Sequence, residues 1–175
     1  GELALETARG AAGRSKGDHE YGEYVRSLPM LTLLQLQRWD ALLKEPMPVG
    51  GRGLAALLGE MSRGIAMARS GKQAEARAAL ERIKPAAKKL AAKHTGKDFE
   101  GKLIRSLATI SEAQLGAEIA FAAQRTDEAL ALQAKASEAA AFADGAEPPM
   151  LANGPRQRLG GMQLKAKWFA AAEQT

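Results

Sequence analysis

The sequence predicts an all-α protein, and three observations lead to this prediction. Alanine, the residue with the highest helix propensity, is abundant throughout the chain. Hydrophobic residues make up 46% of the sequence, yet aromatic residues make up only 5%. Valine and isoleucine are scarce, and no stretch shows the alternation of apolar and polar residues that is typical of a strand. The 175 residues are enough for one domain with a buried core.

The composition also excludes several classes of site. The chain contains no cysteine, which excludes disulfide bonds and sites built on a thiolate. Its longest apolar stretch, Leu28–Leu36, is far shorter than the ~20 residues that a membrane-spanning helix needs. We therefore expect a soluble protein without a membrane span. The sequence is compatible with both the cytoplasm and the periplasm.

The N-terminal segment is the first predicted helix. Glu2–Gly13 carries one apolar stripe at helical spacing, and its last glycines are suited to cap a helix. Arg14–Gly22 follows as a polar loop. We interpret residues 1–22 as the trailing helix of a preceding repeat plus this loop, and residues 23–175 as the main domain.

Four similar segments follow along the chain. Each has an apolar helical stretch, a short polar break, and a small or apolar residue that opens a second helix. The breaks lie at Gln37, Gly71, Gln124 and Lys167, at spacings of 34, 53 and 43 residues. The first spacing equals the period of the tetratricopeptide repeat, and the longer ones leave room for loops. The pattern predicts helical hairpins at about 23–46, 54–93, 102–143 and 154–175.

Three connections separate these hairpins. Pro46 and Pro48 should stop the helix before the glycine-rich segment Val49–Gly53. This segment lacks the Lys-Ser/Thr pair and the preceding strand of a phosphate-binding loop, so we expect a flexible connector. Lys93–Gly101 is polar and contains two glycines, and Ala143–Pro155 contains three prolines, so we expect both to be loops.

The small residues of the hairpins resemble those of a known repeat family. Gly64, Gly71, Ala76 and Leu80 stand where the tetratricopeptide repeat has Gly or Ala, Gly, Ala and a bulky apolar residue. The chain therefore resembles a degenerate tetratricopeptide repeat array, of the kind found in bacterial proteins of mostly unassigned role. The resemblance implies a right-handed superhelix of antiparallel helical hairpins, and a chain that is the C-terminal part of a larger protein. Because the family's aromatic positions are not aromatic here, a generic helical-hairpin solenoid is the alternative.

The sequence gives little support to catalysis. His19 and His94 lie in separate polar segments, and we expect both to be solvated loop residues. No serine motif is present, and no pair of carboxylates has the setting of an acid–base dyad. We therefore expect a non-catalytic protein without a metal site or a cofactor.

One segment carries the basic character of the chain, whose net charge is +5. Residues 82–105 contain eight lysines and arginines against two acidic residues. At this spacing the lysines would lie on one side of a helix, which is either a solvated face or a surface that binds an anionic partner. Such a partner would be nucleic acid, an acidic protein or an anionic membrane. The lack of interleaved aromatic residues argues against nucleic acid. The basic face consists of Lys84, Lys88, Lys89, Lys93 and Lys97.

The resemblance also implies where a partner would bind. In such arrays the first helix of each hairpin lines a concave groove, and the residue mixture here suits an extended or helical peptide. The candidate groove residues are Tyr24, Met61, Ile65, Arg69, Gln114, Glu118, Phe121, Gln157 and Lys165.

The expected function is therefore a protein–protein interaction scaffold that binds a peptide or protein in its groove. One alternative is an anion-binding module, for nucleic acid or an acidic surface, that uses Lys84–Lys97. Another is an accessory part of a larger enzyme. The apolar stripe of the first helix could also pair with a second copy to form a homodimer. Trp39 and Trp168, at matching turns, are expected to pack on neighbouring hairpins, with Trp168 partly exposed because nothing stacks beyond the last helix.

Overall fold

A computed structural model describes residues 1–15, 19–49, 53–143 and 154–175. Every regular element in these ranges is an α-helix, so the all-α prediction is confirmed. None of these helices is long and apolar enough to cross a membrane. The helices are α1 (Glu2–Arg14), α2 (Glu20–Gln35), α3 (Trp39–Lys44), α4 (Leu54–Arg69), α5 (Gln73–Lys93), α6 (Phe99–Ala122), α7 (Thr126–Ala143), α8 (Pro155–Lys165) and α9 (Phe169–Gln174).

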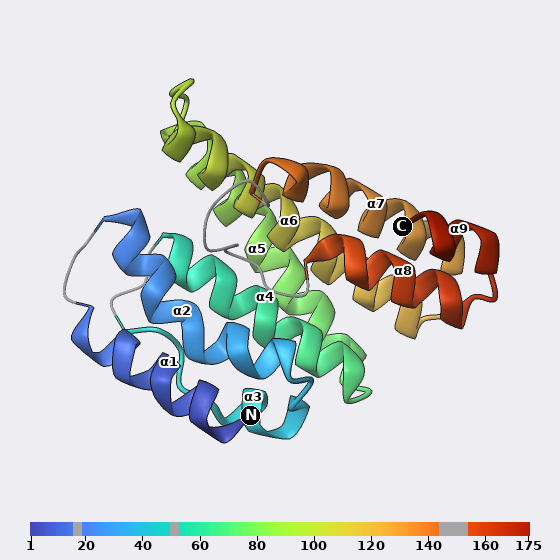
Figure 1. Ribbon diagram of the computed structural model, residues 1–175, viewed down its shortest axis with the longest axis horizontal. Coiled ribbons are helices and arrows are strands. Elements are labelled where there is room, and N and C mark those ends of the chain that lie inside the picture. The colour runs from blue at the N-terminus through green and yellow to red at the C-terminus, as the bar shows by residue number, and fades with distance from the viewer. Residues whose placement is uncertain (16–18, 50–52, 144–153) are drawn as a thin grey trace.

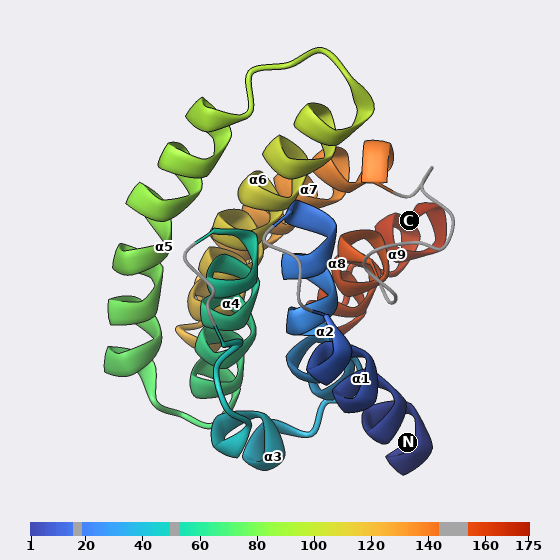
Figure 2. The ribbon, with the colours of Figure 1, turned by 90° about the vertical axis from the view of Figure 1, so that its left-hand side faces the viewer.

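After α1, the helices follow one another in pairs joined by short turns. The pairs are α2–α3, α4–α5, α6–α7 and α8–α9 (Figure 1). In the first three pairs the second helix also packs on the first helix of the next pair, and the first helices α2, α4 and α6 pack in succession (Figure 2). Helix α1 packs on α2 as a second helix would. The core therefore forms between hairpins as well as within them.

The four predicted breaks are the four turns within the hairpins. Gln37, Gly71, Gln124 and Lys167 all adopt positive φ, at 53°, 78°, 59° and 63°. At each turn the N–H of this residue donates to the carbonyl three residues back, and the next N–H donates to the carbonyl five residues back. This pattern is the Schellman motif, which satisfies carbonyl groups at a helix C-terminus. The equivalence of the four breaks is thereby confirmed.

Two helices begin earlier than the sequence indicated. Helix α2 starts at Glu20, inside the predicted loop, because the Nδ1 atom of His19 accepts a hydrogen bond of 3.1 Å from the N–H of Gly22. Helix α6 starts at Phe99, because Oδ1 of Asp98 accepts one of 2.8 Å from the N–H of Gly101. Both side chains are N-caps, which satisfy free amide groups of a first helical turn. Most of the predicted loop 143–155 lies outside the described residues.

A close contact between helices explains one small residue of the second hairpin. A Cβ atom on Gly64 of α4 would lie 2.7 Å from Cδ2 of Leu115 on α6 and 3.2 Å from Cβ of Ala79 on α5. Leu115 has no exposed surface. Gly64 therefore allows three helices to meet, and its neighbour on α5 is Ala79. Ala76, which the sequence placed at this crossing, is also fully buried.

The first hairpin has a much shorter second helix than the two that follow. Helix α3 has 6 residues, whereas α5 has 21 and α7 has 18. It ends at Lys44, just before Pro46, as the prolines indicated. The chain then passes over α4, where a Cβ on Gly59 would lie 2.9 Å from Cε of Met47 and 3.0 Å from Cδ of Pro48.

Candidate functional site

The first helices of all four hairpins contribute side chains to one depression. Its volume is about 430 Å³, and it lies where the C-terminal ends of α2 and α4 approach α6 and α8. We call it the concave depression. It is lined by Gln35, Gln37, Trp39, Arg69, Glu118, Gln157, Arg158, Gly161, Met162 and Lys165.

A buried carboxylate holds two arginines at this site. Glu118 on α6 is only 1% exposed, and its Oε2 lies 2.6 Å from Nε of Arg69 on α4. Its Oε1 accepts hydrogen bonds of 3.0 Å from Nη2 of Arg69 and 3.3 Å from Nη1 of Arg158 on α8. Burial lowers the pKa of Arg158, Glu118 opposes this shift, and the charge of Arg69 adds to it. Two guanidinium groups share one carboxylate, so the cluster carries an excess of positive charge.

Arg158 also connects the first hairpin to the last. Its Nη2 donates a hydrogen bond of 3.4 Å to the carbonyl of Leu34, near the C-terminus of α2. A cation is favourable at this position because the helix dipole places partial negative charge there. The contact brings α8 across the ends of α2, α4 and α6 and so bounds the concave depression.

The structure brings together four of the predicted groove residues. Arg69, Glu118, Gln157 and Lys165 come from three helices and line the concave depression. Gln157 and Lys165 are exposed, whereas the first two form the ion pair. These four positions are therefore the part of the predicted groove that forms one site.

The other predicted groove residues lie elsewhere, which corrects the expected groove. Met61, Ile65 and Gln114 are buried, because α4 and α6 are covered by neighbouring helices on several sides, and so they present no surface to a partner. Phe121 packs against a small second core cluster that contains Met162. Tyr24 packs against the main core and lies beside Tyr21, at 6.4 Å between ring centroids.

Six lining residues of the depression were not predicted as groove residues, and Trp39 and Arg158 are the most informative of them. Trp39 was expected only as a packing residue, but it both packs on the main core and lines the concave depression. Arg158 directly follows the predicted Gln157, yet no sequence signal indicates its pairing with a carboxylate 40 residues earlier. Trp168, in contrast, is 48% exposed and lines no described depression.

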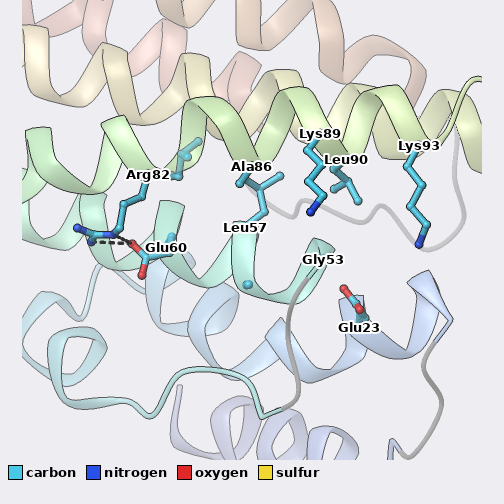
Figure 3. A pocket seen from close by; sticks show the side chains of 11 residues that line it. Glu23, Gly53, Leu57, Glu60, Arg82, Ala86, Lys89, Leu90 and Lys93 are labelled. Atoms are coloured by element: carbon cyan, nitrogen blue, oxygen red, sulfur yellow. Dashed lines mark hydrogen bonds and ion pairs between the residues drawn. The ribbon is translucent and has the colours of Figure 1, made fainter.

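The five predicted lysines have different surroundings in the structure. Lys84 forms an ion pair of 2.6 Å with Glu81, and this hydrogen bond raises the pKa of Lys84. Lys89 and Lys93 line a second cavity of about 480 Å³ between α5, α4 and α2 (Figure 3). Lys88 and Lys97 are exposed and do not line this cavity.

The two histidines have structural contacts. His19 is an exposed residue that caps α2. His94 is only 15% exposed, and its Nε2 lies 3.0 Å from Oε1 of Glu20, so the expectation of a solvated loop histidine is wrong for His94. Within the described residues, no three histidine, aspartate or glutamate side chains are grouped as a metal site would require.

Comparisons with known proteins give no match. No family model matches the chain, and no curated protein and no solved structure is significantly similar to it.

Proposed function

We propose that this chain is a non-catalytic interaction scaffold that binds a peptide or protein segment in the concave depression. The observation on which this proposal depends is the convergence of α2, α4, α6 and α8 on one depression. A partner that lies there would touch every hairpin of the chain. Binding would thus use the whole array.

We further propose that the hairpins form a TPR-like, right-handed superhelix. Four turns with the same backbone geometry support this proposal, as does the packing of each second helix on the next first helix. Gly64 and Ala76, at two small-residue positions of the family pattern, are both buried. Because the aromatic positions of the family pattern hold non-aromatic residues here, a generic helical-hairpin solenoid is the alternative.

The side chains of the depression suit an acidic peptide. Three cationic residues, Arg69, Arg158 and Lys165, line the depression together with one carboxylate, Glu118, which the two arginines already share. Lys165 forms no ion pair within the described part of the chain. It can therefore receive an acidic side chain or a C-terminal carboxylate, while Trp39 offers an apolar wall.

A peptide-display selection tests this proposal. A library of random dodecapeptides would be selected on the intact chain, and the enriched peptides would be synthesised and measured by fluorescence anisotropy. We expect enrichment of Asp and Glu, and about tenfold weaker binding by Lys165→Glu, since one favourable charge contact becomes a repulsion. Lys135→Glu on α7 is the matched control, because Lys135 is exposed and lies outside the depression.

Two outcomes would contradict the proposal. Equal loss of binding in both variants would show that only the net charge matters, and no enrichment at all would remove the depression as a peptide site. Binding of a labelled DNA duplex with a steep salt dependence would instead favour the anion-binding module.

A further inference from the structure

The short second helix of the first hairpin leaves part of the array unfilled. At about 1.5 Å per residue, the 6 residues of α3 extend about 9 Å, and the 21 residues of α5 extend about 31 Å. Helix α2, with 16 residues, is about 24 Å long. Helix α3 therefore runs back along less than half of its partner.

The packing of the later hairpins shows where a longer α3 would lie. Helix α5 packs on its own first helix, α4, and on the next first helix, α6. By the same arrangement, an extension of α3 would lie between the N-terminal halves of α2 and α4, next to the C-terminal half of α5. The 480 Å³ cavity is lined from these three segments. Its residues are Glu23, Gly53, Ala56, Leu57, Glu60, Arg82, Ile83, Ala86, Lys89, Leu90 and Lys93.

Residues 45–49, which directly follow α3, do not continue the helix. Glu45 has extended backbone angles, and Met47 and Pro48 then lie over Gly59 of α4. An extended segment advances about 3.3 Å per residue and lacks the ~10 Å diameter of a helix. None of residues 45–49 lines the cavity. We call this cavity the helix notch.

The floor of the helix notch is apolar and partly made of small residues. Leu57, Ile83 and Leu90 are at most 9% exposed, so this floor is part of the packed core. Ala56 and Ala86 stand beside them, and Ala86 is exposed. Because alanine side chains are short, another helix can approach this surface closely.

The charged side chains that line the notch sum to one positive charge, because Glu23 and Glu60 stand against Arg82, Lys89 and Lys93. Arg82 is paired with Glu60 at 2.9 Å, and Oε2 of Glu23 accepts a hydrogen bond of 3.0 Å from the N–H of Ala55 at the start of α4. Lys89 and Lys93 have no ion pair with any residue that the structure describes. Both extend from α5 along the edge of the notch (Figure 3).

These contacts define the chemistry of an occupant. We infer that the helix notch binds an amphipathic helix of a partner protein, with an apolar face toward Leu57 and Ala86 and two carboxylates one turn apart toward Lys89 and Lys93. Such carboxylates match the one-turn spacing of the two lysines. The helix supplies the packing that the short α3 does not. This surface is separate from the concave depression, with which it shares no lining residue.

A charge-swap experiment tests the inference. The probe is a fluorescent 14-residue helical peptide with alanine and leucine on one face and glutamates at i and i+4, and its binding to the intact chain is followed by anisotropy. Lys89→Glu/Lys93→Glu should weaken binding about tenfold, and a probe with lysines in place of the glutamates should bind this variant better than the wild type. Circular dichroism would verify that each variant is folded.

Two matched variants make the result specific. Lys84→Glu/Lys88→Glu changes the same charge at the same spacing on the same helix but outside the notch, and it should leave binding within about twofold. Lys165→Glu, in the concave depression, should have no effect, so the two proposed sites can fail independently.

The notch is overturned as a helix site by any of three results. The first is no binding of the acidic probe. The second is equal weakening by the two lysine pairs, which would indicate a diffuse attraction of anions. The third is self-association in sedimentation that Lys89→Glu/Lys93→Glu abolishes, which would show that a second copy of this chain occupies the notch. Ala86→Phe, which fills the notch from an exposed position, should also block the probe if the inference is correct.

Discussion

The carboxylate of Glu118 on α6 accepts a hydrogen bond of 3.3 Å from Arg158 on α8, 40 residues later in the chain. The same carboxylate forms the closer ion pair with Arg69. One acidic residue thus fixes two first helices, α4 and α8, to a third. Because Glu118 is almost completely buried, the removal of one partner would leave a charge without compensation at this point of the concave depression.

Removing the charge of Glu118 should destabilise the fold. Glu118→Gln keeps the size of the side chain but leaves Arg69 and Arg158 without their shared carboxylate. We expect a loss of about 2–4 kcal/mol, below the upper range for a fully buried pair because both arginines keep some contact with solvent. Urea denaturation measures this change. Arg158→Met should cost less, about 1 kcal/mol, since Arg69 still pairs with Glu118; a larger loss from Arg158→Met than from Glu118→Gln would contradict this assignment.

The four turn residues predict opposite effects of two substitutions. Gln124 has a φ of 59°, which is strained for a residue with a Cβ, so Gln124→Gly should stabilise the protein by about 0.5–1 kcal/mol. Gly71 has a φ of 78°, so Gly71→Ala should destabilise it by about 1 kcal/mol. Thermal unfolding followed by circular dichroism gives both values. Gln124→Ala is the control for the loss of the polar side chain, and a stabilisation equal to that of Gln124→Gly would show that strain is not the cause.

The contact at Gly64 predicts a coupling between two positions. Gly64→Ala should cost about 1–2 kcal/mol, because the new methyl group would meet Leu115 while the gain in helix propensity is about 1 kcal/mol. In a Leu115→Ala background the same change should be neutral or stabilising, since space is now present. A double-mutant cycle in urea measures the coupling. Gly161→Ala should be stabilising, because outside the adjoining helix backbone nothing lies within 4 Å of the added Cβ. Additive effects of Gly64→Ala and Leu115→Ala would disprove the contact.

The burial of one tyrosine predicts a dependence on alkaline pH. Burial, together with the nearby Tyr21, raises the pKa of Tyr24 to about 12. The folded protein keeps the Tyr24 proton between pH 10 and 12 and the unfolded chain loses it, so this contribution to stability is present below pH 10 and is lost as the pH rises to 12.

Tyrosinate absorbance measures this titration. The chain has two tyrosines, so the Tyr21→Phe variant reports Tyr24 alone. We expect a midpoint well above 10 in the folded protein and close to 10 in concentrated urea. A midpoint near 10 in both conditions would show that Tyr24 is not buried as described.

The turns and the helices could be predicted from the sequence because local signals determine them. Gly71 and its three counterparts interrupt apolar periodicity, and the prolines after Lys44 end α3. The N-caps His19 and Asp98 also indicate where α2 and α6 begin. They were not recognised because they lie in polar segments that read as loops.

The site was less predictable because it depends on how distant helices meet. Position in the repeat pattern indicated a groove-facing side for Met61 and Ile65, but the adjacent helices cover that side completely. The pairing of Glu118 with Arg158 joins two hairpins through their tertiary packing, and neither residue's neighbours in the sequence indicate it. The helix notch likewise depends on tertiary packing, because it lies where the short helix α3 ends beside the longer helices α2, α4 and α5.

The lengths of the connections have a consequence for engineering this chain. Each turn within a hairpin has the same extent, at 36–38, 70–72, 123–125 and 166–168, whereas the connections between hairpins, such as 45–53 and 94–98, differ. The variation in length therefore lies in the connections between hairpins. We therefore expect an inserted segment to be tolerated better in a connection between hairpins than in a three-residue turn, where it should separate the two helices that the turn holds together.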